Sequence, residues 1–141
     1  MKLKLLLFAV ATLLISSTSF SQEANNGKKD NLLFLLRQTE HINQALKTIE
    51  QLKSQPKTTL NTGKIVIIIC GEAVTSLTTK EADVWVEKLS KYPNVSLVAC
   101  GLSLTKFNKS QNDLVKGIDY TENGFIKTFE LQKKGYLSVE L

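Results

Sequence analysis

The two cysteines of the chain share a local setting, because each ends an apolar run and is followed by a glycine. The pairs are Cys70-Gly71 and Cys100-Gly101. Glycine allows the backbone to turn sharply out of an extended run, and both segments lead toward a helix. A thiol beside the start of a helix is deprotonated more easily, because the unpaired N–H groups there stabilise the thiolate. The spacing therefore points to cysteine chemistry at the ends of two strands.

The residues alone leave three roles open for these thiols. Cys70 follows a run of isoleucines, which favours simple packing, since cysteine is among the most buried residue types. Cys100 precedes Gly-Leu-Ser, a turn at which a reactive thiol and an inert one have similar weight. A disulfide between them is the third role, because neighbouring strands lie about 4.8 Å apart and exported chains meet oxidising conditions.

Other common chemistries lack the residues that they need. Zinc sites use four protein ligands, or three in catalytic sites, whereas this chain has two cysteines and one histidine. It also has no haem-attachment, phosphate-loop or dinucleotide-binding motif, so we expect neither a metal nor a cofactor. Ser103 has no identifiable base nearby, which makes it a supporting residue rather than a nucleophile. Gln132 falls on the core-facing stripe expected for the last helix, where it contacts either the site or the last strand.

Strand and helix patterns alternate along the chain and must position these residues. Continuous runs of β-branched and aliphatic residues are typical of strands covered on both faces, as in parallel sheets. Apolar residues at helical spacing lie between these runs. This order predicts βαβ units, and hence a three-layer α/β/α sandwich with a mostly parallel five-stranded sheet. We expect strands at 31–37, 64–70, 95–100, 118–120 and 136–141, and helices after an N-cap at Thr39, around 82–89 and 104–107, and at 121–134 with Phe125, Ile126 and Phe129 facing inward and Leu131 facing outward.

The amino-terminal segment has the composition of a secretory signal peptide. Lys2 and Lys4 precede an apolar run at 5–15, and small and polar residues follow up to Ser21. An eleven-residue run at about 1.5 Å per residue is too short for a hydrocarbon core of about 30 Å, so we expect no stable membrane anchor. The expected organisation is a signal peptide at 1–21, a flexible spacer at 22–30 and one domain at 31–141, in a protein that is exported to a periplasm or secreted.

Removal of the expected signal peptide changes the charge of the protein. The full chain has a formal net charge of +5, whereas residues 22–141 hold 16 Lys and Arg against 13 Asp and Glu, a net charge of +3. The lysines are spread along the chain without a dense basic stripe or interleaved arginines and aromatic residues. Nucleic-acid-binding domains show such a stripe, and we therefore expect no nucleic-acid partner.

Three stretches of the carboxyl-terminal half form a pattern: VSLVACGLSL, NDLVKGIDY and GFIKTFELQKKGYLSVEL. In this pattern a strand ends in a cysteine that is shortly followed by a Ser-Leu pair, and the chain closes with Leu-Gln-x-x-Gly-Tyr; the positions are Cys100, Ser103, Leu104, Leu131, Gln132, Gly135 and Tyr136. The pattern resembles that of the DsrE/DsrF-like sulfur-relay superfamily. The resemblance covers roughly residues 31–141, is loose in the amino-terminal half, and is closest to the exported, stand-alone members.

The resemblance implies a parallel five-stranded sheet, assembly into trimers or hexamers, and a persulfide carried on Cys100. Its partners would be a sulfane-sulfur donor and an acceptor thiol. Family members often have His-Gly after the second strand, where this chain has Cys70-Gly71, so a titratable partner is lost and a second, resolving thiol is gained. Gly71, Gly101, Ser103 and Gln132 are the expected supporting residues. The alternative is a non-catalytic oligomeric module with the same fold, in which both cysteines are structural or disulfide-linked.

Overall fold

The computed structural model describes residues 27–55 and 59–141 of the chain. The expected signal peptide and most of the expected spacer lie outside the described residues. The strands are β1 (Asp30–Leu36), β2 (Thr62–Ile69), β3 (Val95–Cys100), β4 (Asp119–Thr121) and β5 (Leu137–Glu140), and the helices are α1 (Thr39–Ser54), α2 (Glu81–Ser90), α3 (Gly101–Lys106) and α4 (Gly124–Lys133), with two short 3-10 helices, η1 (Gly71–Thr78) and η2 (Gln111–Asp113).

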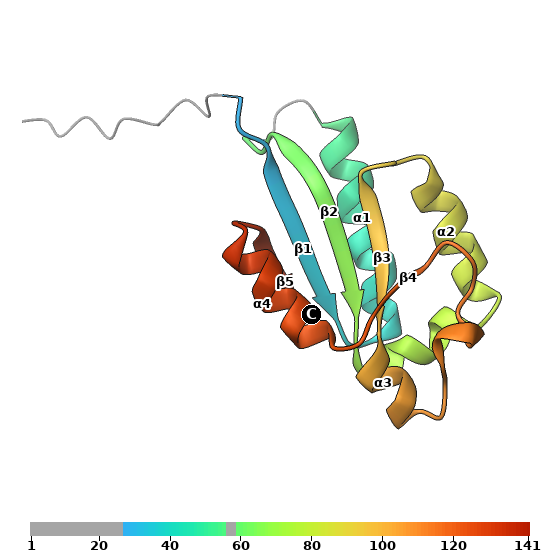
Figure 1. Ribbon diagram of the computed structural model, residues 1–141. Helices are drawn as coiled ribbons and strands as arrows, with labels where there is room; N and C mark the ends of the chain where they lie inside the picture. Colours follow the sequence, from blue (N-terminus) through green and yellow to red (C-terminus); the bar gives the residue numbers. More distant parts are fainter. Residues whose placement is uncertain (1–26, 56–58) are drawn as a thin grey trace, which may run out of the picture.

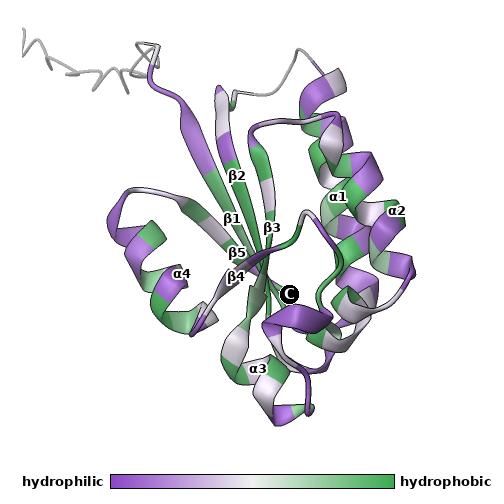
Figure 2. Cartoon of the chain, turned by 45° about the vertical axis from the view of Figure 1, so that its right-hand side comes forward, coloured by the Kyte–Doolittle hydropathy of each residue, from purple (hydrophilic) through white to green (hydrophobic). Residues whose placement is uncertain are grey.

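The strands form one five-stranded sheet in the order β4-β3-β2-β1-β5, and every neighbouring pair is parallel. β1, β2 and β3 point the same way in Figure 1, so their carboxyl ends meet at one edge, next to α3. The sheet confirms the expected α/β class and the mostly parallel arrangement. Hydrophobic residues are concentrated in the strands, whereas the outer surfaces of α1 and α2 are largely hydrophilic (Figure 2).

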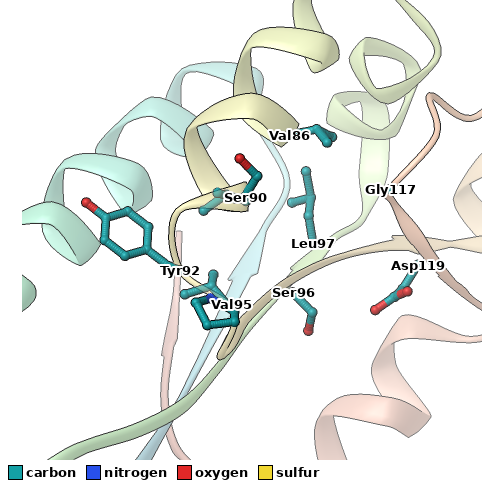
Figure 3. A pocket seen from close by; sticks show the side chains of 10 residues that line it. Val86, Ser90, Tyr92, Val95, Ser96, Leu97, Gly117 and Asp119 are labelled. Atoms are coloured by element: carbon teal, nitrogen blue, oxygen red, sulfur yellow. The ribbon is translucent and has the colours of Figure 1, made fainter.

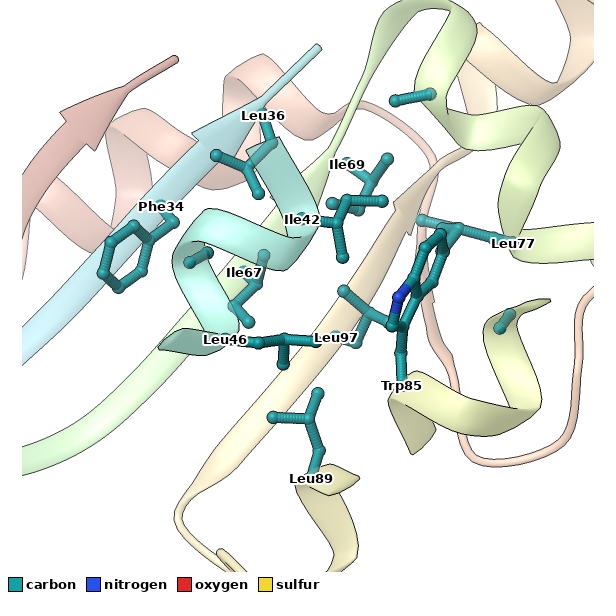
Figure 4. Packing of buried hydrophobic residues seen from close by; sticks show 14 of the residues in the cluster. Phe34, Leu36, Ile42, Leu46, Ile67, Ile69, Leu77, Trp85, Leu89 and Leu97 are labelled. Carbon is teal, nitrogen blue, oxygen red and sulfur yellow. The ribbon is translucent and has the colours of Figure 1, made fainter. Parts of the chain in front are cut away.

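One face of the sheet carries the larger hydrophobic core. α1, α2 and η1 pack there, and the cluster includes fully buried Ile42, Ile67 and Leu77 together with Trp85, which Figure 4 shows at close range. The indole Nε1 of Trp85 donates a 3.2 Å hydrogen bond to the side chain of Asn43, which links α2 to α1. This face holds the apolar stripes that were expected for the first two long helices. α1 begins one residue earlier than expected, because Gln38 is the N-cap and Thr39 the first helical residue.

The other face carries a smaller core beneath α4 (Figure 1). We call it the α4 core; its members come from alternate positions of the central strands and from one turn of the helix. Such alternation is the ordinary consequence of successive strand residues pointing to opposite faces of a sheet. Both thiols lie in this core. Its buried members are Leu33, Leu35, Val66, Ile68, Cys70, Val98, Cys100 and Leu131.

The expected inward stripe of α4 is wrong. Phe125, Ile126 and Phe129 are 40%, 56% and 67% exposed, whereas Leu131, expected outside, is 6% exposed. The helix begins at Gly124 rather than near residue 121, and its buried positions are Gly124, Thr128 and Leu131. Small residues occupy the side nearest the sheet because the helix lies close to the strands there. The apolar pattern of the sequence therefore marks the outer surface of α4.

None of the helices within the described ranges is long and apolar enough to cross a membrane.

Candidate functional site

The two cysteines lie side by side at the carboxyl edge of the sheet. In the register of β2 and β3, Ile69 is the partner of Ala99. The residues that follow this pair are Cys70, directly after the end of β2, and Cys100, the last residue of β3. Both side chains belong to the α4 core, and they are only 1% and 0% exposed. The parallel register and the strand pleat thus place both thiols in one layer, on the same face.

The two thiols are free and in contact. Neither cysteine is in a disulfide, and a hydrogen bond joins their side chains. Neighbouring strands are spaced about 4.8 Å apart, which lies within the Cα separations found in disulfides, roughly 4.4–6.8 Å. The pair Cys70 and Cys100 is therefore a dithiol whose backbone spacing suits a disulfide.

The first turn of α4 rests directly on both sulfur atoms. The backbone N–H of Gly124 donates a 3.3 Å hydrogen bond to Sγ of Cys100. A Cβ added to Gly124 would lie 2.6 Å from Sγ of Cys70 and 3.1 Å from Cβ of Cys100, so no side chain fits at this position. Asn123 caps the helix, because its side-chain oxygen accepts hydrogen bonds from the backbone N–H groups of Phe125 and Ile126.

We expect Gly124→Ala to lower the free energy of unfolding by about 1–3 kcal/mol, the usual cost of forcing a methyl group into a packed core. Urea unfolding measures the change. The matched experiment repeats the substitution in a Cys70→Ala background, where the closest contact of the new methyl group is removed. The cost should then be smaller, since residues in contact are not additive. An equal cost in both backgrounds would mean that Gly124 does not press on the Cys70 sulfur.

Ser103 and Gly71 complete the surroundings of Cys100. The N–H of Gly71 donates a 2.9 Å hydrogen bond to Oγ of Ser103, and Ser103, through its hydroxyl and its backbone amide, helps to lower the pKa of the Cys100 thiol. Gly71 has φ of +60°, and a Cβ there would lie 3.3 Å from the carbonyl oxygen of Arg37. Glycine is thus required for the tight exit from β2 that brings this amide to Ser103.

The hydrogen bonds divide the pair into a proton donor and a thiolate. The hydrogen bond from Cys70 is the main cause that lowers the pKa of the Cys100 thiol; burial opposes it, and the Gly124 amide and Ser103 add to it. The pKa of Cys70 is raised far above its ordinary value by that same bond, then by burial and by the charge of Cys100. Donors that bind the charged form always shift a pKa toward ionisation. Cys100 is therefore the more acidic thiol of the pair, and Cys70 is its proton donor.

A charged and aromatic rim lies at the same edge. The Arg37 guanidinium forms a 2.5 Å ion pair with Glu140 and lies 5.4 Å from the centre of the Phe125 ring. Their charges act on Cys70 in opposite directions, since Arg37 lowers its pKa and Glu140 raises it. Both side chains are about half exposed, and such surface pairs contribute roughly 0–1 kcal/mol. The rim therefore shapes the edge of the site more than it stabilises the fold.

The remaining expected residues divide between the site and its surroundings. Gly101 opens α3 beside Cys100, and the Tyr120 ring packs against it so closely that a Cβ would lie 2.9 Å from a ring carbon. Gln132 lies elsewhere: it is exposed, and its side-chain amide donates a 2.9 Å hydrogen bond to Oγ of Ser138 in the last strand. Gln132 therefore ties α4 to β5 and is not part of the thiol cluster.

The sequence interpretation missed the Gly124 amide, its cap Asn123, and Arg37. Asn123 carried a usable signal, because asparagine is among the preferred N-cap residues and here it precedes the helix directly. Arg37 carried none, since its approach to the thiols depends on strand order and on the position of β5. Among the described residues, no group of three or more His, Cys, Asp or Glu side chains could hold a metal ion.

A separate pocket of about 420 Å³ lies between α2 and the start of β3 (Figure 3). Its lining includes Val86, Leu97 and Gly117, with Asp119 as its only charged residue. It contains neither thiol, because Cys100 is at the opposite end of β3. The thiol pair combines a stabilised anion with a bound proton, whereas this pocket has no comparable chemistry, so the candidate site is the thiol pair.

Comparison with known proteins identifies the fold only. No family model matches the chain, and no curated protein matches it. Among solved structures, the chain is similar to a protein of unknown function, MTH1491 from Methanobacterium thermoautotrophicum, with a TM-score of 0.64 and 15% identity, covering 81% of this chain and 100% of that one. An identity this low supports a shared fold and no shared activity. The similarity agrees with an α/β sandwich, the class that the sequence predicts.

Proposed function

We propose that the protein is an exported, DsrE/DsrF-like sulfur carrier that holds a persulfide on Cys100. The observation that carries this proposal is the set of donors around Cys100: the Cys70 thiol, the Gly124 amide and Ser103. Together they favour the thiolate, which is the nucleophilic form of cysteine. The resemblance to DsrE/DsrF-like proteins supports the sulfur chemistry of the proposal, and the expected signal peptide supports the proposed export.

The proposed reaction needs no cofactor. The Cys100 thiolate attacks the terminal sulfane sulfur of an anionic polysulfide, and a new S–S bond forms. The adjacent S–S bond of the donor breaks, and the shortened polysulfide leaves with the electron pair, as in thiol–disulfide exchange. The product is a Cys100 persulfide, a reversible modification of cysteine, which then passes its outer sulfur to an acceptor thiol.

The direct test is the intact mass of the protein after brief treatment with polysulfide. We expect a gain of about 32 Da, one sulfur atom, that is absent in Cys100→Ser and retained in Cys70→Ser. The second variant is the matched control, because it also replaces a buried thiol of the α4 core. Uptake that survives in Cys100→Ser, or no uptake in any form, would contradict the proposal.

Burial favours a second candidate, a non-catalytic module with inert thiols. Cys100 is 0% exposed and Cys70 1% exposed, and buried cysteines often act as small hydrophobic residues. This alternative expects no sulfur uptake by the native protein and unchanged assembly in Cys100→Ser. The mass experiment therefore separates the two functions.

We further propose that the protein assembles with copies of itself through the outer face of α4 and the neighbouring edge strand β5. Phe129 and Ile126 on α4 and Leu137 and Val139 on β5 are large apolar residues with about half or more of their surface exposed. β5 is also an edge strand, and uncovered edges favour pairing with another chain. The trimers or hexamers of the resembled family give the expected size range.

We expect Phe129→Glu to dissociate the oligomer, because a buried, unpaired carboxylate in an interface costs several kcal/mol. Light scattering after size-exclusion chromatography gives the mass of the assembly. Val84→Glu is the matched control, since Val84 is 50% exposed on α2, which packs on the opposite face of the sheet. Equal masses for the wild type and both variants would place the interface elsewhere or show a monomer.

A further inference from the structure

Burial decides which thiol can reach a sulfur atom held on Cys100. An outside acceptor reaches a side chain that is 0% exposed only when the first turn of α4, which covers it, moves aside. Cys70 is the only other cysteine of the chain, and it is already hydrogen-bonded to Cys100. The persulfide would therefore have its resolving thiol inside the same core.

We infer that Cys70 resolves the Cys100 persulfide, so that the sulfur leaves as hydrosulfide and the two cysteines are left as a disulfide. The inference rests on the proposed loading of Cys100 and changes its outcome. In place of a persulfide handed to a second protein, the product is a small ion that can leave a buried site.

The backbone geometry suits this step. The register Ile69–Ala99 makes the two cysteines the next neighbours on adjacent parallel strands, and both side chains lie in the α4 core. A disulfide needs a Cα separation of roughly 4.4–6.8 Å and side chains directed at each other. The strand spacing of about 4.8 Å meets the first need, and the position of both side chains beneath Gly124, where Sγ of Cys70 and Cβ of Cys100 flank the same point, meets the second.

Loading of Cys100 changes the state of Cys70. In the free dithiol, Cys70 keeps its proton chiefly because it donates that proton to the Cys100 sulfur. A persulfide moves the negative charge from Sγ of Cys100 to the outer sulfur, so the main reason for holding the proton at Cys70 is removed. Proton transfer from Cys70 to the outer sulfur then gives a thiolate next to a persulfide with a good leaving group.

The resolving step balances in atoms and charge. The Cys70 thiolate attacks Sγ of Cys100, the bond between Sγ and the outer sulfur breaks, and hydrosulfide leaves with the electron pair. The two cysteines lose two electrons in all, and the sulfane sulfur gains them. An external dithiol must reduce the Cys70–Cys100 disulfide, in molecules in which the first turn of α4 has opened, before the next cycle, so a dithiol reductant is the class of partner that this site requires.

The test loads the purified exported protein with polysulfide, removes the donor, and follows intact mass and released sulfide with time. In the wild type we expect the gain of about 32 Da to disappear, a species about 2 Da lighter than the dithiol to appear, and about one sulfide per chain to be released. Cys70→Ser and Cys70→Ala should retain the added sulfur and release at least tenfold less sulfide. Two variants are used because serine keeps a hydrogen-bond donor and alanine does not.

The outcomes separate this inference from the function on which it rests. Sulfur retained equally long in the wild type and in Cys70→Ser overturns the resolving role and leaves the carrier intact. No sulfur uptake in any form overturns the carrier and the resolving step together. In that case, oxidation of the protein by a small disulfide still tests the geometry: a loss of about 2 Da in the wild type, absent in Cys70→Ser, would keep Cys70 and Cys100 as a redox pair.

Discussion

Alkylation of Cys100 in the native protein should be at least about a hundredfold slower than in denaturant, and Asn123→Ala should speed the native reaction about fivefold. The slow rate follows from burial, since a sealed thiol reacts only in transiently opened molecules, and an opening free energy of about 3 kcal/mol gives such a factor. The acceleration follows from the cap. Its loss costs a helix about 1 kcal/mol, which is roughly a fivefold change in the open population.

Iodoacetamide labelling, mapped to Cys100 by peptide mass, measures both rates. Ser110→Ala is the matched control, because it removes a side chain from another capping arrangement, in which Ser110 donates to Asp113. The residues that follow this capping arrangement pack on the larger core, which lies on the opposite face of the sheet from α4. Removal of the Ser110 side chain should therefore leave the labelling rate of Cys100 unchanged. Fast labelling of the native wild type would show that α4 does not seal the thiol, and an unchanged rate in Asn123→Ala would place the opening elsewhere.

Cys70→Ala should raise the pKa of Cys100 toward the ordinary cysteine value of roughly 8.5. The hydrogen bond from Cys70 is the first cause of the lowered pKa, and hydrogen bonds to charged groups contribute about 1.5–3 kcal/mol. A lowered pKa means that the thiolate persists at neutral pH and is lost as the pH falls into the acid range. This free energy corresponds to about one to two pH units, so without the Cys70 donor the thiolate should be lost at a pH about one to two units higher than in the wild type.

The ultraviolet absorbance of the thiolate, with Cys100→Ser as the blank, gives the titration directly. Cys70→Ser should titrate closer to the wild type than Cys70→Ala does, because the serine hydroxyl can still donate to the sulfur. Identical titrations of the wild type and Cys70→Ala would mean that Gly124 and Ser103 alone hold the anion. In that case Cys70 would not be the proton donor of the pair.

The strand pattern predicted the frame of the site. The isoleucine run before Cys70 and the run ending in Cys100 indicated buried parallel strands, and ligands of such sheets gather at their carboxyl ends. Both thiols lie there. Whether they faced each other depended on the register of β2 and β3, which no local pattern specifies, because a shift of one residue reverses every side chain.

The helix above the thiols was predicted, but which of its faces packs on the sheet could not be predicted from hydrophobicity. The aromatic residues Phe125 and Phe129 gave α4 an apparent apolar stripe, but the side against the sheet is lined by Gly124 and Thr128. Close packing of a helix on strands selects small residues, and a hydropathy pattern does not detect this. The contact between the Gly124 amide and the thiols was not predicted for the same reason, since a helix with the opposite face on the sheet would place this amide away from the thiols.

The absence of a side chain at Gly124 has a mechanical consequence for the proposed binding of sulfur to Cys100. A methyl group has no room between this residue and the two cysteines, and a sulfur atom is close to a methyl group in size. Sulfur that entered on this side would push the first turn of α4 outward, together with the aromatic residue that follows it. The position of the helix would then depend on whether Cys100 carries sulfur, and its displacement would alter the contacts of any copy of the protein bound to its outer surface.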